Sequence, residues 1–256
     1  DLREQSSELT TSRSGGSEPR GRPAFRAWRR GWRYSTIQAF SSLIVIQMTL
    51  SVAGTEIGSL MATETAYTIA PLSPQTWPAF DALVQRHNGI FGGCWCIWFH
   101  PDGPERGQGA EANRELKKAY VESGQAHAAL VMDGEEAIAW AEFGTPAELP
   151  TIHHRKQYDA TKSADPDYRI TCVFVDKRYR RQGVTELAIS GALGMIARAG
   201  GGVVESYPHD LTEQTKKMSS SFLYNGTRRL YERLGFTYDR PKGLRNCVMV
   251  KTVDPA

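Results

Sequence analysis

The segment 168–208 constrains the fold more than any other part of this sequence. It opens with the mostly apolar run Tyr168–Val175, which predicts a strand, and it ends with a second strand-like run, 201–208. Between them, residues 183–200 are apolar on almost every side, which is typical of a helix packed against a sheet and other elements. A strand, a buried helix and a strand at this spacing predict a right-handed parallel crossover, and therefore an α/β domain.

The flanking sequence predicts further strands and helices. Asp133–Gly134 is a compact turn signal between two strands, and residues 145–168 are polar and turn-rich, which is typical of a functional or mobile loop. The other expected elements are a strand at 66–72, helices at 73–85, 109–123 and 220–235, and closing strands at 236–243 and 245–253.

Residues 1–60 differ in composition from the rest of the chain. They contain eight Arg, no Lys and five acidic residues, so they carry the whole net charge of +3 and residues 61–256 are neutral. The neutral part is not expected to bind nucleic acid. We interpret residues 1–60 as a disordered or non-native extension and 61–256 as the folded domain. The alternative is a targeting or membrane-surface segment, although polar residues interrupt its apolar run 43–50, so no firm membrane association is expected.

The cysteines do not form a metal-binding pattern. Cys94-x-Cys96 has the wrong spacing for zinc, and Cys172 and Cys247 stand far from each other. We therefore expect no metal, and free or buried thiols in a reducing compartment such as the cytoplasm. Neither Cys94 nor Cys96 is expected to act as a nucleophile, because no paired histidine is identifiable.

Four cationic residues, Lys177, Arg178, Arg180 and Arg181, stand just ahead of Gly183, where the crossover strand gives way to its helix. Like charges this close repel one another unless an anion lies among them. The amides of a strand-to-helix loop point outward at the positive end of the helix, and a glycine lets a ligand approach them. The loop therefore predicts a phosphate site, although neither the P-loop nor the dinucleotide-binding pattern occurs.

The loop letters RRQGVT at 180–185 resemble the Q/R-x-x-G-x-G/A motif of the GNAT superfamily of acetyl-CoA-dependent N-acetyltransferases, with Thr185 where Gly or Ala is usual. The resemblance covers residues 61 to about 253 and extends to "LYERLGF" at 230–236 and to the order of the elements. It implies a mixed, mostly antiparallel central sheet in which the parallel strand–helix–strand crossover forms the coenzyme A cleft. It also implies acetyl-CoA as cosubstrate.

The same resemblance implies roles for individual residues. In that family the loop holds the coenzyme A pyrophosphate, the preceding strand runs beside pantetheine and polarises the thioester carbonyl, and a tyrosine protonates the departing thiolate. These roles fall on Arg180, Arg181, Gln182, Gly183, Val184 and Thr185 for the pyrophosphate, on Val173, Phe174 and Val175 for pantetheine, and on Tyr231 for the thiolate.

Some of these residues have alternative interpretations. Tyr231 could instead be a core tyrosine. Lys177 and Arg178 either reach the 3′-phosphate of the coenzyme or form a solvated turn. The asparagine that the family usually places seven residues before the tyrosine falls at Tyr224, with Asn225 one position later.

The general base is less clear from the sequence. Glu142 and Glu205 lie on strands expected near the cleft, but strand alternation could equally turn them to solvent or a salt bridge. His153 and His154 lie on a polar loop and are expected to be solvated, and a water chain is a further alternative.

The segment 91–103 concentrates aromatic residues after the first helix. In the resembled fold this region helps to wall the acceptor site, which falls on Trp95, Trp98 and Phe99, and the alternative is that these rings belong to the core.

Together these patterns predict transfer of an acetyl group from acetyl-CoA to a primary amine by direct attack in a ternary complex. The acceptor, a small molecule or a protein amine, is open, as is a homodimer. The alternative function is a non-catalytic acyl-CoA-binding regulatory module.

Overall fold

A computed structural model describes residues 67–103, 109–211 and 223–256 of the chain. The extension 1–60 and the expected domain start at Met61 lie outside the described residues. The strands are β1 (Thr68–Pro71), β2 (His127–Asp133), β3 (Glu136–Gly144), β4 (Tyr168–Val175), β5 (Gly202–Ser206), β6 (Thr237–Lys242) and β7 (Asn246–Val253). The helices are α1 (Trp77–Arg86), α2 (Ala110–Glu122), α3 (Arg155–Thr161), α4 (Val184–Arg198) and α5 (Arg228–Arg233), with a 3-10 turn at Lys177–Tyr179.

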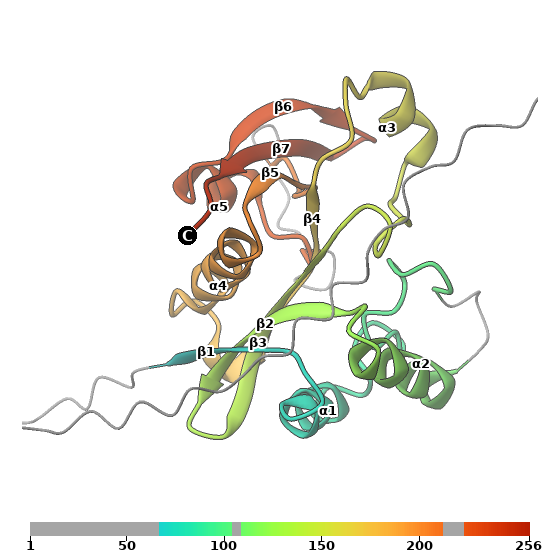
Figure 1. The fold of residues 1–256 in the computed structure, drawn as a ribbon, viewed down its shortest axis with the longest axis vertical. Helices are drawn as coiled ribbons and strands as arrows, with labels where there is room; N and C mark the ends of the chain where they lie inside the picture. The colour runs from blue at the N-terminus through green and yellow to red at the C-terminus, as the bar shows by residue number, and fades with distance from the viewer. Residues whose placement is uncertain (1–66, 104–108, 212–222) are drawn as a thin grey trace, which may run out of the picture. The chain divides into compact units, whose positions relative to one another are not determined.

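The seven strands form one sheet in the order β1-β2-β3-β4-β5-β7-β6. Every neighbouring pair is antiparallel except β4 and β5, which are parallel. The expected mixed, mostly antiparallel sheet with one parallel crossover is therefore confirmed. Figure 1 shows β1, β2 and β3 in the lower half of the domain and β5, β6 and β7 in the upper half, with β4 between them.

The parallel strands β4 and β5 pair over only three residues, so the rest of β4 is not paired with β5. Tyr168, Arg169 and Ile170 of β4 pair with the last three residues of β5, which ends at Ser206, whereas β4 continues to Val175. The edge of β4 from residue 171 onward therefore has no strand partner on the β5 side. An unpaired strand edge presents amide and carbonyl groups that can bind another extended chain.

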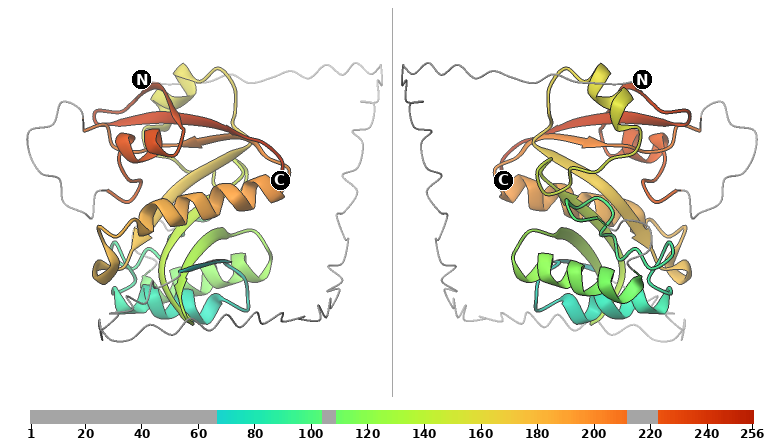
Figure 2. Two further views of the ribbon diagram at one scale, coloured as in Figure 1. Left: turned by 90° about the vertical axis from the view of Figure 1, so that its left-hand side faces the viewer. Right: turned by 90° about the vertical axis from the view of Figure 1, so that its right-hand side faces the viewer.

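Helices cover the two faces of the sheet. α4 packs against β2, β3 and β4, and α1 packs against β3 on the opposite face (Figure 2). Small side chains bring α4 close to the sheet, because a methyl group at Gly191 would meet Ile69 at 2.8 Å. The helix buries one stripe and leaves Leu187 41% exposed, so it is enclosed on fewer sides than its sequence predicts.

Two other expectations are corrected by the structure. The polar segment 145–168 is not all loop, because it contains α3. The helix expected over 220–235 is reduced, within the described residues, to the six residues of α5. Gly226 precedes it with a φ of +70°, a left-handed conformation that interrupts a helix.

Candidate active site

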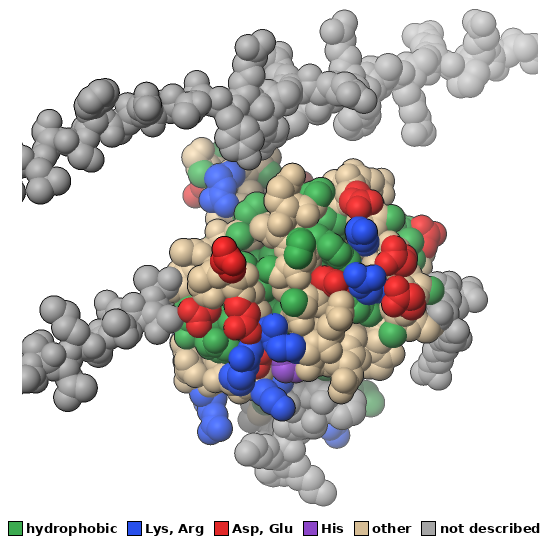
Figure 3. Space-filling view, turned by 90° about the horizontal axis from the view of Figure 1, so that it is seen from below, with side chains coloured by type: hydrophobic (Ala, Val, Ile, Leu, Met, Phe, Trp, Pro, Cys, Tyr) green, Lys and Arg blue, Asp and Glu red, His purple; other side chains and the backbone are tan. Residues whose placement is uncertain are grey.

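The cationic loop after β4 is partly neutralised by the protein's own carboxylates. Asp176, 1% exposed, accepts hydrogen bonds from the Arg178 amide at 3.0 Å and from its guanidinium at 2.8 Å. Glu136 also accepts from Arg178, at 2.5 Å. Burial alone would raise the pKa of Asp176, but Arg178 and His87 hold it well below its ordinary value. Arg178 is thus accounted for without an external anion. Seen from below, several Lys and Arg side chains of the domain lie beside Asp and Glu side chains (Figure 3).

The turn that follows leaves the start of α4 open. Arg181 and Gly183 have φ values of +62° and +78°, and no side chain of the described residues caps the helix. A Cβ built on Gly183 would meet no atom within 4 Å. Because the first amides of a helix have no partner within the helix, an uncapped start with free space in front of it suits a phosphate group.

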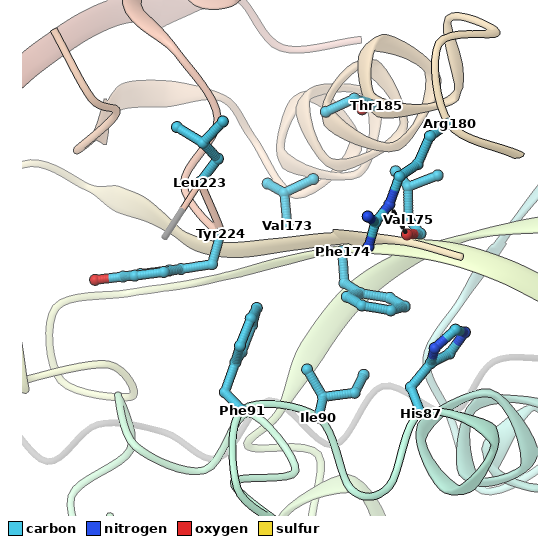
Figure 4. Close-up of a pocket in the computed structure, with 10 residues that line it drawn as sticks. All are labelled: His87, Ile90, Phe91, Val173, Phe174, Val175, Arg180, Thr185, Leu223 and Tyr224. Carbon is cyan, nitrogen blue, oxygen red and sulfur yellow. Dashed lines mark hydrogen bonds between the residues drawn. The ribbon is translucent and has the colours of Figure 1, made fainter. Parts of the chain in front are cut away.

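A pocket of about 300 Å³, here called the β4 pocket, lies beside this turn (Figure 4). Of the residues predicted to hold the coenzyme, Val173, Phe174, Val175, Arg180 and Thr185 line it. The remaining lining residues are His87, Ile90, Phe91, Leu223 and Tyr224.

The other four predicted coenzyme residues are not among its lining residues: Arg181, Gln182 and Gly183 form the adjoining turn, and Val184 begins α4. The Val184 side chain is buried in the core beneath α4, and the side-chain amide of Gln182 donates to the Arg178 carbonyl.

One predicted oxyanion donor already has a partner. The Val173 amide donates to the Tyr224 carbonyl at 2.6 Å, on the edge of β4 that β5 leaves open. The Asp176 amide donates to Ile138 of β3, so by strand alternation the Phe174 amide also faces β3. The Val175 amide shares the open edge with Val173, and the Val175 carbonyl accepts from Arg180 at 3.3 Å (Figure 4).

A second pocket, here called the thiol pocket, has a volume of about 280 Å³. It is lined by Phe91, Cys94, Cys96, Trp98, Phe99, His153, Cys172 and Tyr224. Phe91 and Tyr224 also line the β4 pocket, so the two cavities are neighbours. Of the residues predicted to wall the acceptor site, Trp98 and Phe99 line this pocket, whereas Trp95 is a core residue, 4% exposed and stacked on Trp77.

Sequence reasoning missed three lining residues of the thiol pocket. His153 is exposed, as expected, but it also stacks on Trp98 with ring centroids 4.0 Å apart. Partial burial of its ring against Trp98 and the positive charge of Lys242 lower the pKa of His153 to about 4, so the imidazole is neutral at neutral pH. Cys172 and Tyr224 come from distant segments, and no local motif marks them.

The buried thiols are not arranged for nucleophilic attack. Cys96 and Cys172 are buried with their sulfur atoms 2.9 Å apart, and all four cysteines are free. Burial raises the pKa of Cys96 well above its ordinary value, so the thiol stays protonated.

Glu142 lies in a buried ion cluster. Its Oε1 accepts from the Lys117 ammonium at 2.6 Å, its Oε2 accepts from the Thr171 hydroxyl at 2.7 Å, and His100 lies 3.5 Å from Oε1. Burial acts to raise the pKa of Glu142, but Lys117 and His100 lower it to about 2. A carboxylate with both oxygens occupied and so low a pKa is poorly suited to take a proton from an amine.

Glu205 is similarly occupied. It is 4% exposed, and its Oε2 accepts from the hydroxyls of Tyr158 at 2.7 Å and Tyr207 at 2.9 Å. Arg240 lies 3.5 Å from Oε1. Neither Glu205 nor Glu142 is among the described residues that line the two pockets.

Tyr231 is fully buried on α5, with its ring against Phe236 at 5.0 Å. Its hydroxyl has no hydrogen-bond partner of normal geometry among the described residues. Burial raises the pKa of Tyr231, an effect that Ser206 at the end of β5 partly offsets. The phenol is therefore protonated at neutral pH, close to the strand end where β4 and β5 separate.

Residues with a strained backbone conformation lie in and next to the segments that line these two pockets. Seven described residues other than glycine have positive φ, and five of them, Asn88, Ile90, Phe91, Trp95 and Cys96, lie in the segment after α1. The other two are His154, next to the thiol pocket, and Arg181 in the turn before α4. Such strain costs on the order of 1–3 kcal/mol per residue and is typical of functional sites.

Within the described ranges, no His, Cys, Asp and Glu side chains are grouped to hold a metal ion. No helix in the same ranges is long and apolar enough to cross a membrane.

No protein-family model and no curated protein matches the sequence. Among solved structures, the chain is similar to a protein from Desulfovibrio desulfuricans assigned to the GNAT family of acetyltransferases, with 17% identity, a TM-score of 0.44, and coverage of 73% of this chain and 99% of that one. A protein from Corynebacterium glutamicum described as histone acetyltransferase HPA2 and related acetyltransferase has 18% identity and a TM-score of 0.43, with 74% of this chain and 97% of that one covered.

Arabidopsis thaliana NAA60 in complex with acetyl-CoA has 15% identity and a TM-score of 0.39, with 73% of this chain and 100% of that one covered. The solved structures to which the chain is similar thus include an acetyltransferase assigned to the GNAT family, a second protein described as an acetyltransferase, and a protein that binds acetyl-CoA.

Proposed function

We propose that this chain is an N-acetyltransferase of the GNAT superfamily that moves the acetyl group of acetyl-CoA to a primary amine. The observation that carries the proposal is the edge of β4 beyond Ile170, where β5 no longer pairs with it. This edge lies beside the uncapped start of α4 and lines the same pocket as Arg180 and Thr185. The uncapped amides and Arg180 suit a diphosphate, and the strand edge suits the extended amide chain of pantetheine. Arg180 lines the β4 pocket and Arg178 does not, so Arg180 is the favoured phosphate ligand.

The reaction proceeds by direct attack within a ternary complex. The amine nitrogen forms a bond to the thioester carbon, the carbon–sulfur bond breaks, and the departing thiolate takes a proton from the Tyr231 hydroxyl. The Val175 amide, on the open edge of β4, stabilises the developing oxyanion. The amine proton leaves through water, because Glu142 and Glu205 are both engaged in ion clusters, and a proton from water restores the Tyr231 hydroxyl.

Binding of coenzyme A to two glycine variants tests the pyrophosphate site. Gly183 and Gly124 have similar φ values of +78° and +71°, and a methyl group at either meets no atom within 4 Å. Gly183→Ala and Gly124→Ala should therefore lose comparable stability, of about 1–2 kcal/mol. Only Gly183→Ala places a methyl group in the phosphate site, so it alone should weaken coenzyme A binding, by roughly tenfold in Kd measured by calorimetry. Equal affinities in the two variants would contradict the proposed site.

One observation favours a second candidate, a non-catalytic acyl-CoA-binding module. The Val173 amide is bonded to Tyr224, and the Tyr231 hydroxyl is buried, so two groups expected to act in catalysis are withdrawn from the pockets. Release of free thiol from acetyl-CoA with a panel of amines separates the two functions. Tight coenzyme binding with no turnover on any amine would favour the binding module.

A further inference from the structure

The thiol pocket is placed to hold the acceptor if the β4 pocket holds acetyl-CoA, and this inference rests on that proposed function. The two pockets share Phe91 and Tyr224, and Cys172 of the thiol pocket directly precedes Val173 of the β4 pocket along β4. A ligand in the thiol pocket therefore lies next to the strand that we assign to the thioester.

Aromatic rings form most of the wall of the thiol pocket. Trp98 packs on Phe99 at 5.0 Å between centroids and at an interplanar angle of 84°, and Tyr224 lies 6.2 Å from Phe99 and 6.0 Å from Phe91. The His153 ring continues this wall by stacking on Trp98. Rings in tilted and edge-to-face arrangements bind a further aromatic ring with about 0.5–1.5 kcal/mol more than its area alone provides.

The charges around the pocket disfavour a second cationic group on the ligand. No Asp, Glu, Lys or Arg occurs among the described residues that line it. The Glu142 carboxylate behind the wall is paired with Lys117, whose ammonium also lies 3.4 Å from the Cys96 carbonyl. On the other side, the charge of Lys242 acts on His153. A diamine would thus bury an ammonium without a counter-charge, which is costly.

The pocket is small. Its volume of about 280 Å³ lies just below the roughly 300–1,000 Å³ of pockets for drug-sized ligands. Cys96, one of its lining residues, is buried and has a left-handed φ of +51°. One ring with a short side chain fits this size better than an extended peptide does.

We propose that the thiol pocket binds a small primary amine that carries one aromatic ring and a short aliphatic arm, and that this amine is the acetyl acceptor. The ring lies against Trp98 and Phe99, and the arm directs the amine toward β4. The uncharged amine attacks the acetyl carbon, a carbon–nitrogen bond replaces the carbon–sulfur bond, and the amine proton passes to water. The products are an N-acetylated arylalkylamine and free coenzyme A.

Steady-state acetylation by the full chain tests this proposal with four probes: 2-phenylethylamine, n-hexylamine, putrescine and a short peptide with an N-terminal phenylalanine. We expect kcat/KM for 2-phenylethylamine to exceed that for each of the others by roughly tenfold or more. A higher value for putrescine or for the peptide would overturn the proposal, the latter in favour of a protein acceptor.

Two variants examine the ring site and the charge of the pocket separately. Trp98→Ala should raise KM for 2-phenylethylamine by roughly tenfold and remove its advantage over n-hexylamine, while binding of coenzyme A is unchanged. Tyr238→Ala, which removes a ring that is 40% exposed on β6, is the matched control and should leave the ratio intact. Cys94→Asp supplies the missing counter-charge at a partly exposed position and should shift preference toward putrescine.

Measuring acetyl-CoA binding separately distinguishes failure of the acceptor assignment from failure of the proposed function. If acetyl-CoA binds but the ratio of 2-phenylethylamine to n-hexylamine is the same in Trp98→Ala as in the unmodified chain, the acceptor assignment is overturned and the acetyl-CoA site stands. If acetyl-CoA does not bind, both fail.

Discussion

The hydroxyl of Tyr231 is buried without a hydrogen-bond partner of normal geometry among the described residues, so its removal separates a catalytic from a structural role. In Tyr231→Phe, we expect kcat to fall by roughly 10²-fold because the thiolate loses its acid. The free energy of unfolding should not fall, since no hydrogen bond is lost. Both quantities are measured on the same preparation, by thiol release and by urea denaturation.

Tyr207→Phe provides the matched control for this change. Tyr207 is also buried, but its hydroxyl donates to Glu205 at 2.9 Å. Its loss should lower stability by about 1 kcal/mol and leave kcat nearly unchanged. If Tyr231→Phe kept full activity, the acid role would be abandoned and Tyr231 would be a core residue.

At Glu142 the prediction concerns stability and its dependence on pH. The folded pKa of about 2 lies below the ordinary value of 4.5, so the contribution of Glu142 to stability is complete above pH 4.5 and is lost as the pH falls toward 2. Glu142→Gln should abolish that part of the acid dependence. It should also lower the free energy of unfolding at pH 7 by about 3 kcal/mol, because the Lys117 ammonium is left buried without its partner.

The double variant Lys117→Met/Glu142→Gln checks the physical cause. Removing both charges should recover much of the lost stability, as measured by urea denaturation at pH 7. If the double variant were as unstable as Glu142→Gln alone, the ion pair would not be the source of the effect.

At the scale of elements, the loop between β4 and α4 contains two kinds of arginine. Arg180 lines the β4 pocket, and Arg178 lies outside its lining, against Asp176 and Glu136. Arg180→Ala should therefore weaken coenzyme A binding by about tenfold, and Arg178→Ala by much less. Titration calorimetry at two salt concentrations measures both variants, and a larger loss in Arg178→Ala would reassign the phosphate ligand.

Elements with a strong local pattern of apolar residues were predictable from the sequence. A short polar helix and the point at which a glycine shortens a helix were not. β4 and the hairpin of β2 and β3 follow from apolar runs and from the turn at Asp133–Gly134. α3 was missed because its sequence is polar and only Tyr158 is buried. α5 was predicted too long because the left-handed Gly226 lies just before it, so the helix begins only at Arg228.

At the scale of the whole molecule, the predicted domain start at Met61 is a testable proposal. A chain that begins at Met61 should match the full chain in its urea unfolding midpoint and in its Kd for coenzyme A, because the described elements and both pockets lie between residues 67 and 256. A lower midpoint in the shorter chain would show that residues 1–60 contribute to the fold.

Only the part of the candidate site that is contiguous in the sequence could be predicted from the sequence. The turn from Arg180 to Thr185 is contiguous, so a short motif reveals it. The thiol pocket brings together side chains from the segment after α1, from β4, and from His153 and Tyr224, and only the folded sheet makes these neighbours. Burial likewise decides that Trp95 belongs to the core and that Glu142 belongs to an ion cluster.

Phe91 and Tyr224 belong to both cavities, and this has a consequence for how two reactants meet. Whichever molecule arrives first fixes the rotamers of these side chains and so alters the room that the second one finds. Linkage then requires the influence to be mutual and equal in free energy. The strength of the coupling between the two reactants therefore depends on these two side chains, and exchanging either one should change the cooperativity with which the reactants bind.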